Sequence, residues 1–352
     1  MIFENLEKYG CEEIIFFQDK KTDLKAIVAL HDTTLGPAFG GTRLWNYHNE
    51  EEALTDVLRL AKAMSRKASI TGLDCGGGKA VIIADPRNKT EAMIKAYAQF
   101  VDRLQGKLLT GEDVGIDVKD TVIMKKETKY IVGASETVSD PSIPTAYGVI
   151  YGMMACAKEV FGSSQLSGLT IAIQGVGHVG YNLARELHKD GVKIIASDMI
   201  EERTKRVADE FGAKIVSTEE IYSVDCDIFS PCALGAIINE ETIPKLKCKV
   251  VAGSANNQLK EDAHGDGLHK RGILYAPDYL INAGGLISAY MDWKQNTVEE
   301  IMKKLEEIGD GMEKIISTSK KTGEPTYKIA HRLADERLLI KKRELGASKL
   351  DC

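Results

Sequence analysis

The first part of the chain, to about residue 135, alternates short apolar runs with amphipathic helical patterns. Glu13 to Gln18 and Leu24 to Ala29 predict two paired strands, the second extended by Leu30. Between Glu50 and Lys67 apolar residues recur at helical spacing and predict an amphipathic helix. Further along, a glycine-rich stretch over 72–79 runs straight into a predicted buried strand over 80–84, and the pattern then predicts a helix over 91–104 and a short strand over 108–110.

A polar stretch with two prolines, Ser139 to Pro144, follows and predicts a hinge. Beyond it, a long helical pattern covers Thr145 to Phe161, and short apolar runs then alternate with helical stretches, as in a doubly wound parallel sheet. The predicted strands cover 169–173, 192–196, 214–216, 228–231, 250–252 and 273–276. Two charged helices, over 298–321 and 326–345, are predicted at the end of the chain.

The turn after the strand at 169–173 carries glycines in G-x-G-x-x-G spacing. The first glycine permits a tight turn, the second lets the backbone approach a pyrophosphate, and the third lets helix pack on strand. The next strand leads to Asp198, 23 residues after the first glycine, where a carboxylate can hold ribose hydroxyls and favours NAD over NADP. The predicted cofactor is NAD, and its predicted contacts here are Gly175, Val176, Gly177, His178, Val179, Gly180 and Asp198.

Composition narrows the class of protein. The formal charge of −6 argues against nucleic acid as a partner, and no basic block changes that. The N-terminus lacks the plan of a signal peptide, and no apolar run approaches the length of a membrane span. The seven cysteines form no C-x-x-C pair, so we expect reduced thiols in a cytoplasmic protein. The histidines form no H-E-x-x-H motif, and no metal site is expected.

A nicotinamide cofactor implies hydride transfer, with the substrate held by the other domain, where two lysines stand out. Lys79 lies between three glycines and a buried strand, so its amine is expected to be partly desolvated and usable as a base. The alternative is a surface amine in a flexible turn. A phosphate-binding P-loop is excluded, because Ala80 stands where that motif needs Ser or Thr. Lys67, at a helix end, is either a substrate-binding cation or a solvated amine.

Three further polar residues are candidates. Asp113 lies between two glycines, where it either meets a ligand or forms a turn. Asn257 and Asn282 follow predicted strand ends, which face the ligand crevice in this architecture. Either asparagine could instead cap a helix.

Together these motifs resemble the amino acid dehydrogenases that act on glutamate, leucine, phenylalanine and valine, most of all the leucine and phenylalanine members. The similarity covers nearly the whole chain. The matching segments are H-D-T-T-L-G-P-A-F-G-G-T-R (31–43), G-G-G-K-A-V-I-I (76–83), G-E-D-V-G (111–115), F-S-P-C-A-L-G (229–235), G-S-A-N-N-Q-L (253–259) and A-P-D-Y-L-I-N-A-G-G-L-I (276–287).

The resemblance implies reversible oxidative deamination of an L-amino acid to a 2-oxo acid and ammonium. It implies that Lys67, helped by Asn257, binds the substrate carboxylate, that Lys79 is the general base, and that Asp113 exchanges protons with the substrate amine. It also implies close backbone approach at Gly40 and Gly41. The residues implied along the nicotinamide are Cys232, Ala233 and Asn257, and Asn282 is a further predicted cofactor contact.

The resemblance also implies a fold and an assembly. We expect two α/β domains with a cleft between them: an N-terminal substrate domain with a mixed sheet, and a C-terminal Rossmann domain, doubly wound, that binds NAD. The expected boundaries are 1–138 for the substrate-binding and oligomerisation domain, 139–325 for the NAD domain, and 326–352 for a helix returning to the first domain. A homo-oligomer, from dimer to octamer, is expected.

The side-chain pocket decides the substrate. Glutamate members carry a lysine where Phe39 stands, so glutamate is disfavoured here by about several kcal/mol. Phenylalanine members typically have Gly and Leu at the positions of Gly111 and Leu286, whereas leucine members have Ala and Val. Ala289 opens the pocket further, while the large Phe39 closes it.

L-phenylalanine is therefore the predicted substrate. The alternative is leucine or another branched-chain amino acid, and tryptophan also fits such a pocket. A non-catalytic NAD-binding protein is a more remote alternative.

Overall fold

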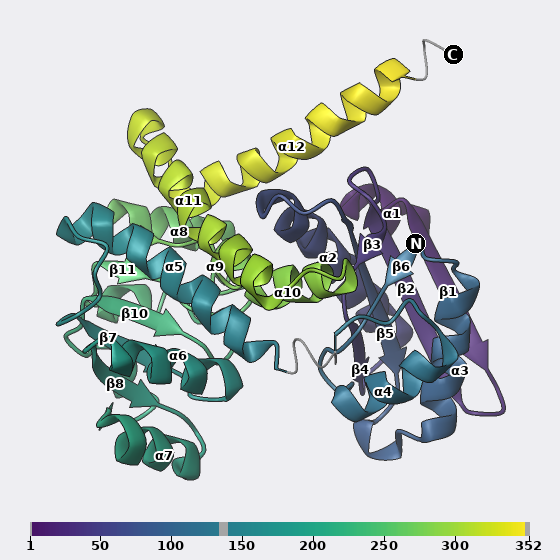
Figure 1. The fold of residues 1–352 in the computed structure, drawn as a ribbon, viewed down its shortest axis with the longest axis horizontal. Helices are drawn as coiled ribbons and strands as arrows, with labels where there is room; N and C mark the ends of the chain where they lie inside the picture. The colour runs from purple at the N-terminus through teal and green to yellow at the C-terminus, as the bar shows by residue number, and fades with distance from the viewer. Residues whose placement is uncertain (1, 134–139, 349–352) are drawn as a thin grey trace. The chain divides into compact units, whose positions relative to one another are not determined.

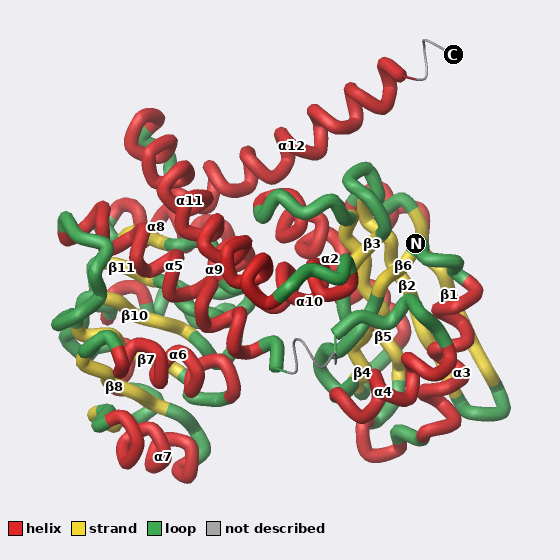
Figure 2. Tube along the Cα trace, in the orientation of Figure 1, coloured by secondary structure: helices red, strands yellow, loops and turns green. Residues whose placement is uncertain are grey.

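The computed structural model describes residues 2–133 and 140–348. The chain divides into two compact units. Unit 1 consists of Met1–Ser139, Ala289–Thr297 and Ala334–Cys352, and unit 2 of Asp140–Ser288 and Val298–Leu333. In both units strands alternate with helices, as the yellow and red segments of Figure 2 show. Of the predicted hinge, Ser139 lies outside the described residues.

Unit 1 is built on a mixed sheet. Its strand order is β1-β2-β5-β3-β6, and β4 also pairs with β5. The pairs β1–β2 and β2–β5 are antiparallel, while β3 and β4 run parallel to β5. The strands are β1 (Glu13–Asp19), β2 (Leu24–Asp32), β3 (Ala38–Phe39), β4 (Thr42–Trp45), β5 (Gly76–Ile83) and β6 (Leu108–Leu109).

Helices cover both faces of this sheet because successive residues of a strand point to opposite sides. Ala29 and Val81 pack with Val57 and Leu58 of α2 (Glu50–Ile70) on one face. Ala80 and Ile82 pack on the other face, with residues of α3 (Glu91–Arg103) and α4 (Val118–Glu127). A short α1 (Ile2–Tyr9) contacts α2.

The strand predicted over 80–84 begins earlier, at Gly76, and ends at Ile83. Gly76, Gly77 and Gly78 are the first residues of β5. A Cβ added to Gly77 would lie 2.1 Å from the backbone nitrogen of Ser65, so the glycine lets α2 approach the strand closely. Lys79 therefore projects from a rigid strand beside a tightly packed helix.

Unit 2 contains a parallel sheet with the order β12-β11-β10-β7-β8-β9. This is the strand order of a dinucleotide-binding Rossmann fold, with its switch point between β7 and β10. The strands are β7 (Thr170–Gln174), β8 (Lys193–Ser197), β9 (Lys214–Ile215), β10 (Ile228–Pro231), β11 (Val250–Val251) and β12 (Leu274–Tyr275). The predicted fold class, α/β with a mixed sheet and a doubly wound sheet, is confirmed.

The helices of unit 2 pack around this sheet. α5 (Ser142–Phe161) contacts α6 (His178–Lys189), α11 (Val298–Thr322) and β11 (Figure 1). This unit also contains α7 (Glu201–Phe211), α8 (Asp262–Lys270) and α9 (Asp278–Ile281), with short 3₁₀ turns at Glu220–Tyr222 and Ile243–Lys245. A further 3₁₀ turn, at Pro86–Asn88, belongs to unit 1.

Two helices, α10 (Gly284–Trp293) and α12 (Thr326–Ser348), begin with residues of unit 2 and end with residues of unit 1. No helix in the described part of the chain combines the length and apolar character needed to cross a membrane.

Candidate active site and dinucleotide site

An ion pair between a buried lysine and a partly buried carboxylate joins two of the predicted catalytic residues. The Nζ atom of Lys79 lies 2.8 Å from Oδ1 of Asp113. Lys79 is only 5% exposed, because it lies in β5 beneath α2. The alternative of a surface amine in a flexible turn does not describe this residue. The structure thus brings together a lysine and a carboxylate that are far apart in the sequence.

Arg43, which the sequence did not mark as a site residue, binds the other oxygen of the Asp113 carboxylate. Its Nε donates a hydrogen bond of 2.8 Å to Oδ2 of Asp113. Its NH1 group lies 2.9 Å from Asp56, which also accepts a hydrogen bond from the hydroxyl of Tyr47. Arg43 is the last residue of the segment 31–43 that resembles the family, and this position is what could have marked it as a site residue.

The charges around Asp113 set its protonation state. Burial raises the pKa of the Asp113 carboxyl, but the adjacent Lys79 and Arg43 outweigh burial and hold the pKa below its usual value. Asp113 is therefore a carboxylate at neutral pH and able to accept a proton.

Two glycines bring the backbone close to this pair. A Cβ on Gly40 would lie 1.9 Å from the carbonyl oxygen of Gly78, and one on Gly41 would lie 2.2 Å from that of Glu112. These short distances leave no room for a side chain. The segment after β3 therefore runs directly beside the residues that precede Lys79 and Asp113.

Three more predicted substrate contacts lie in unit 1. Lys67 is half-buried in the last turn of α2. Phe39 is buried at the end of β3, and its ring lies edge-on to that of Tyr290. Ala289 lies one turn after the buried Leu286 on α10, whose first residues belong to unit 2.

Gly111 has a packing reason for being glycine. A Cβ at this position would lie 2.5 Å from the carbonyl oxygen of Val132. The missing methyl group therefore makes room for the backbone of Val132, and an enlarged substrate pocket is not needed to explain this glycine.

The glycine fingerprint forms the turn between β7 and α6. Gly175 has φ +91°, and a Cβ on it would lie 2.6 Å from the Cβ of Ala233 in the loop after β10. A Cβ on Gly180 would lie 2.0 Å from the carbonyl oxygen of Gly175. Gly177 is less crowded: in the described part of the chain, a Cβ added to it would have one neighbour within 4 Å, NH1 of Arg203 at 3.7 Å. Gly177 is the N-cap residue of α6, where the open backbone suits the approach of phosphate oxygens.

Asp198 stands beside this turn. One carboxylate oxygen accepts a hydrogen bond of 2.9 Å from the backbone nitrogen of Val176, and the other accepts one of 3.0 Å from that of Ile200. NH1 of Arg203 lies 3.7 Å away. His178 is exposed at the start of α6, and Val179 is half-buried behind it. The acid and the glycine turn are thus assembled at the carboxyl ends of β7 and β8.

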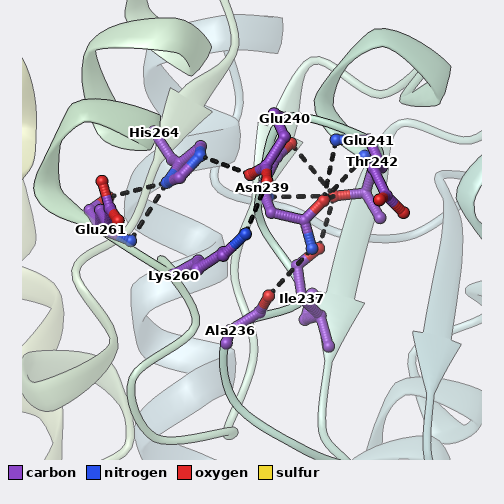
Figure 3. A network of polar contacts seen from close by, with 9 residues as sticks. All are labelled: Ala236, Ile237, Asn239, Glu240, Glu241, Thr242, Lys260, Glu261 and His264. Atoms are coloured by element: carbon purple, nitrogen blue, oxygen red, sulfur yellow. Dashed lines mark hydrogen bonds and ion pairs between the residues drawn. The ribbon is translucent and has the colours of Figure 1, made fainter.

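The loops after β10 and β11 are bound to each other. The backbone nitrogen of Ala236 donates to the carbonyl oxygen of Asn257 at 2.7 Å, and both residues have positive φ. Glu240 adds an ion pair of 2.6 Å with Lys260 and a contact of 3.0 Å with His264 (Figure 3). This network fixes the segments that follow Cys232 and carry Asn257.

Asn282 has a free acceptor within the part of the chain that the structure describes. Its amide nitrogen donates to the carbonyl oxygen of Ser254 and to Oδ1 of Asn256, at 3.2 and 2.8 Å. Its Oδ1 atom is buried and has no hydrogen-bond partner. A buried amide oxygen is costly unless it accepts a hydrogen bond, and the carboxamide of a nicotinamide is a suitable donor. The residues present therefore fit a dinucleotide.

These features define a class. A Rossmann sheet with a glycine turn, an acid after the second strand and a buried amide oxygen that lacks a donor is typical of NAD(P)-dependent dehydrogenases. Unit 1 contributes the ion pair between Lys79 and Asp113.

The chain belongs to the Glu/Leu/Phe/Val dehydrogenase family. The family's dimerisation domain matches residues 12–135, and its dehydrogenase domain matches 139–200 and 198–346. The protein is accordingly an amino acid dehydrogenase, an oxidoreductase that acts on CH–NH₂ groups.

Named relatives differ in substrate. The chain is 52% identical to leucine dehydrogenase from Geobacillus stearothermophilus over 96% of this chain and 93% of the relative. It is 48% identical to phenylalanine dehydrogenase from Lysinibacillus sphaericus, over 87% and 82%. The crystal structure of L-tryptophan dehydrogenase from Nostoc punctiforme superposes with a TM-score of 0.85 at 44% identity, covering 97% of this chain and all of that one (100%).

Proposed function

We propose that this protein catalyses the NAD-dependent, reversible oxidative deamination of branched-chain L-amino acids, with L-leucine as its best substrate. The observation that carries the proposal is the ion pair between the buried Lys79 and the partly buried Asp113, 2.8 Å apart, in a chain of this family. The reaction converts L-amino acid, NAD⁺ and water to 2-oxo acid, ammonium, NADH and a proton.

The side chains divide the work. The ammonium of Lys67 binds the substrate carboxylate, assisted by the amide of Asn257. The ionised Asp113 accepts a proton from the substrate amine. Lys79 acts as the general base toward the water that attacks the imino carbon. When bound, the dinucleotide supplies the hydride acceptor for the substrate α-carbon.

The proposed cofactor is NAD. The family is NAD(P)-dependent, and the choice between the two rests here on Asp198, whose charge disfavours a 2′-phosphate. The residues proposed to hold NAD are Gly175, Val176, Gly177, His178, Val179, Gly180, Asp198, Cys232, Ala233, Asn257 and Asn282.

Leucine replaces phenylalanine as the first choice of substrate for two reasons. The named relatives include leucine dehydrogenases at 52% identity, above the phenylalanine enzyme at 48%. Gly111 also no longer favours phenylalanine, because the glycine is needed to accommodate the carbonyl group of Val132. One methyl in an apolar pocket changes preference by only about 1–3 kcal/mol, so neighbouring substrates should be turned over as well.

The assembly is proposed to be a homo-oligomer. The N-terminal family model describes a dimerisation domain, which supports association through unit 1.

The test is NADH formation by purified protein with L-leucine, L-valine, L-phenylalanine, L-tryptophan and L-glutamate in parallel. We expect leucine to have the highest kcat/KM and glutamate to be inactive. A Lys79→Ala variant should lose about 10²–10⁴-fold in kcat, the usual contribution of a positioned base.

A surface control is Lys107→Ala, which removes an exposed ion pair with Glu13 and should keep wild-type turnover. A protein that turns over none of the five amino acids would contradict the proposal. A highest kcat/KM for L-phenylalanine would instead support the substrate predicted from the sequence.

A further inference from the structure

An aromatic residue outside the matching segments lies against the predicted substrate pocket. Tyr290, on the part of α10 that belongs to unit 1, meets Phe39 with a distance of 6.0 Å between ring centroids and an angle of 68° between ring planes. Tyr290 is 8% exposed and Phe39 is 3% exposed. Such edge-to-face pairs of buried rings are favourable and hold both rings in defined positions.

Phe39 projects from the same face of the sheet as Lys79. Phe39 pairs with Gly77 across the parallel strands β3 and β5. Residues opposite each other on paired strands share a face, and so do residues two apart along one strand. Gly77 and Lys79 are two apart on β5, so the Phe39 ring, with Tyr290 against it, lies on the catalytic side of the sheet.

Several contacts fix the Tyr290 ring. Its hydroxyl donates a hydrogen bond of 3.2 Å to the carbonyl oxygen of Asp74. The centroid of the Trp293 ring lies 6.2 Å from the centroid of the Tyr290 ring. Arg337 of α12 holds the segment that carries Asp74, through a bond of 2.8 Å to its carboxylate and one of 2.7 Å to the Leu73 carbonyl. These contacts hold the Tyr290 ring in one position.

Tyr290 has no role in proton transfer. Burial raises the pKa of its hydroxyl, which stays protonated, and the hydroxyl proton is donated to a backbone oxygen. What the residue offers a substrate is the apolar ring and the space that the ring fills.

We propose that Tyr290 is a specificity-determining residue, whose ring closes the far end of the side-chain pocket at Phe39. Phe39 and Tyr290 together occupy the space that a substrate ring would need, while a branched aliphatic side chain ends before it. This inference rests on the proposed function and explains why branched aliphatic amino acids are preferred over aromatic ones.

The test compares kcat/KM for L-leucine and L-phenylalanine in wild type, Tyr290→Ala and Tyr290→Phe. Removing the ring should lower the leucine-to-phenylalanine ratio by about tenfold or more, the scale of pocket contacts of this size. Tyr290→Phe keeps the ring and loses only the hydroxyl, so it should keep the wild-type ratio within about twofold, well below the effect of a single pocket contact. A ratio between substrates does not depend on the fraction of folded enzyme.

Tyr290→Leu is the second variant, because removing a buried ring can prevent folding; it fills part of the space and should move the ratio in the same direction. An unchanged ratio in folded Tyr290→Ala or Tyr290→Leu would overturn the inference, as would a wild-type preference for phenylalanine. Loss of all amino acid turnover in the wild type would instead refute the proposed function.

Discussion

Asp113 has two cationic partners, and this sets the behaviour of the site at the scale of single residues. Lys79 and Arg43 bind different oxygens of the same carboxylate, at 2.8 Å each. Partial burial would otherwise favour the neutral form of the carboxyl group. The two cations keep Asp113 ionised, and its charge in turn allows Lys79 to be buried.

Replacing this carboxylate should have a pH-dependent effect on stability. The pKa of Asp113 is lowered on folding, so its ionised form stabilises the native state above its ordinary value of about 3.9, and the contribution is lost as pH falls through the lower folded value. Asp113→Asn should therefore melt well below wild type at pH 7. The difference in Tm should shrink below about pH 4. Thermal melts across this range measure it; a constant difference would contradict the assigned charge.

Asp198 should control the choice of cofactor. Asp198→Asn keeps an acceptor for the Val176 nitrogen but removes the negative charge beside Arg203. We expect the Kd of NADH to rise and that of NADPH to fall, measured by fluorescence titration. Equal changes for both dinucleotides would show that the carboxylate does not discriminate between them.

At the scale of elements, the packing of α2 on β5 depends on glycine. A Cβ at Gly77 would lie 2.1 Å from the Ser65 nitrogen, whereas a Cβ at Gly346 on α12 would have no neighbour within 4 Å among residues 2–133 and 140–348. Gly77→Ala should lower the free energy of unfolding by about 1–3 kcal/mol through overpacking. Gly346→Ala is the matched control and should stabilise the chain or leave it unchanged, because alanine favours helix. Urea denaturation compares the two, and equal effects would contradict the packing argument.

Elements with a strong local pattern were predicted well. The strand at 228–231 has the expected bounds, and the helix expected over 50–67 extends to Ile70. The strand expected to begin at Ala80 begins at Gly76, because glycine weakens a strand pattern unless another backbone needs to approach closely. The prediction also omitted α1 and α4, since both are short.

Across the whole molecule, the residues proposed to bind the cofactor and those proposed to transfer protons belong to different units. The glycine turn and Asp198 are in unit 2, whereas Lys79 and Asp113 are in unit 1. Saturating NADH should therefore raise Tm in Lys79→Ala as much as in wild type, corresponding to about 2.7 kcal/mol at 100 times Kd. Differential scanning calorimetry measures this, and a missing shift in the variant would contradict the separation.

Features that depend on neighbouring residues along the chain could be predicted from the sequence: the helical and strand periods, the glycine fingerprint followed by an acid, and the family that these motifs indicate. Three contacts are visible only in the tertiary structure. Arg43 binds Asp113, and Tyr290 packs against Phe39. Gly111 lies against the carbonyl group of Val132. Those contacts join residues distant in the chain, and no local pattern records them. They exist because the sheet of unit 1 places its strand ends side by side and because α10 and α12 contribute residues to the same unit.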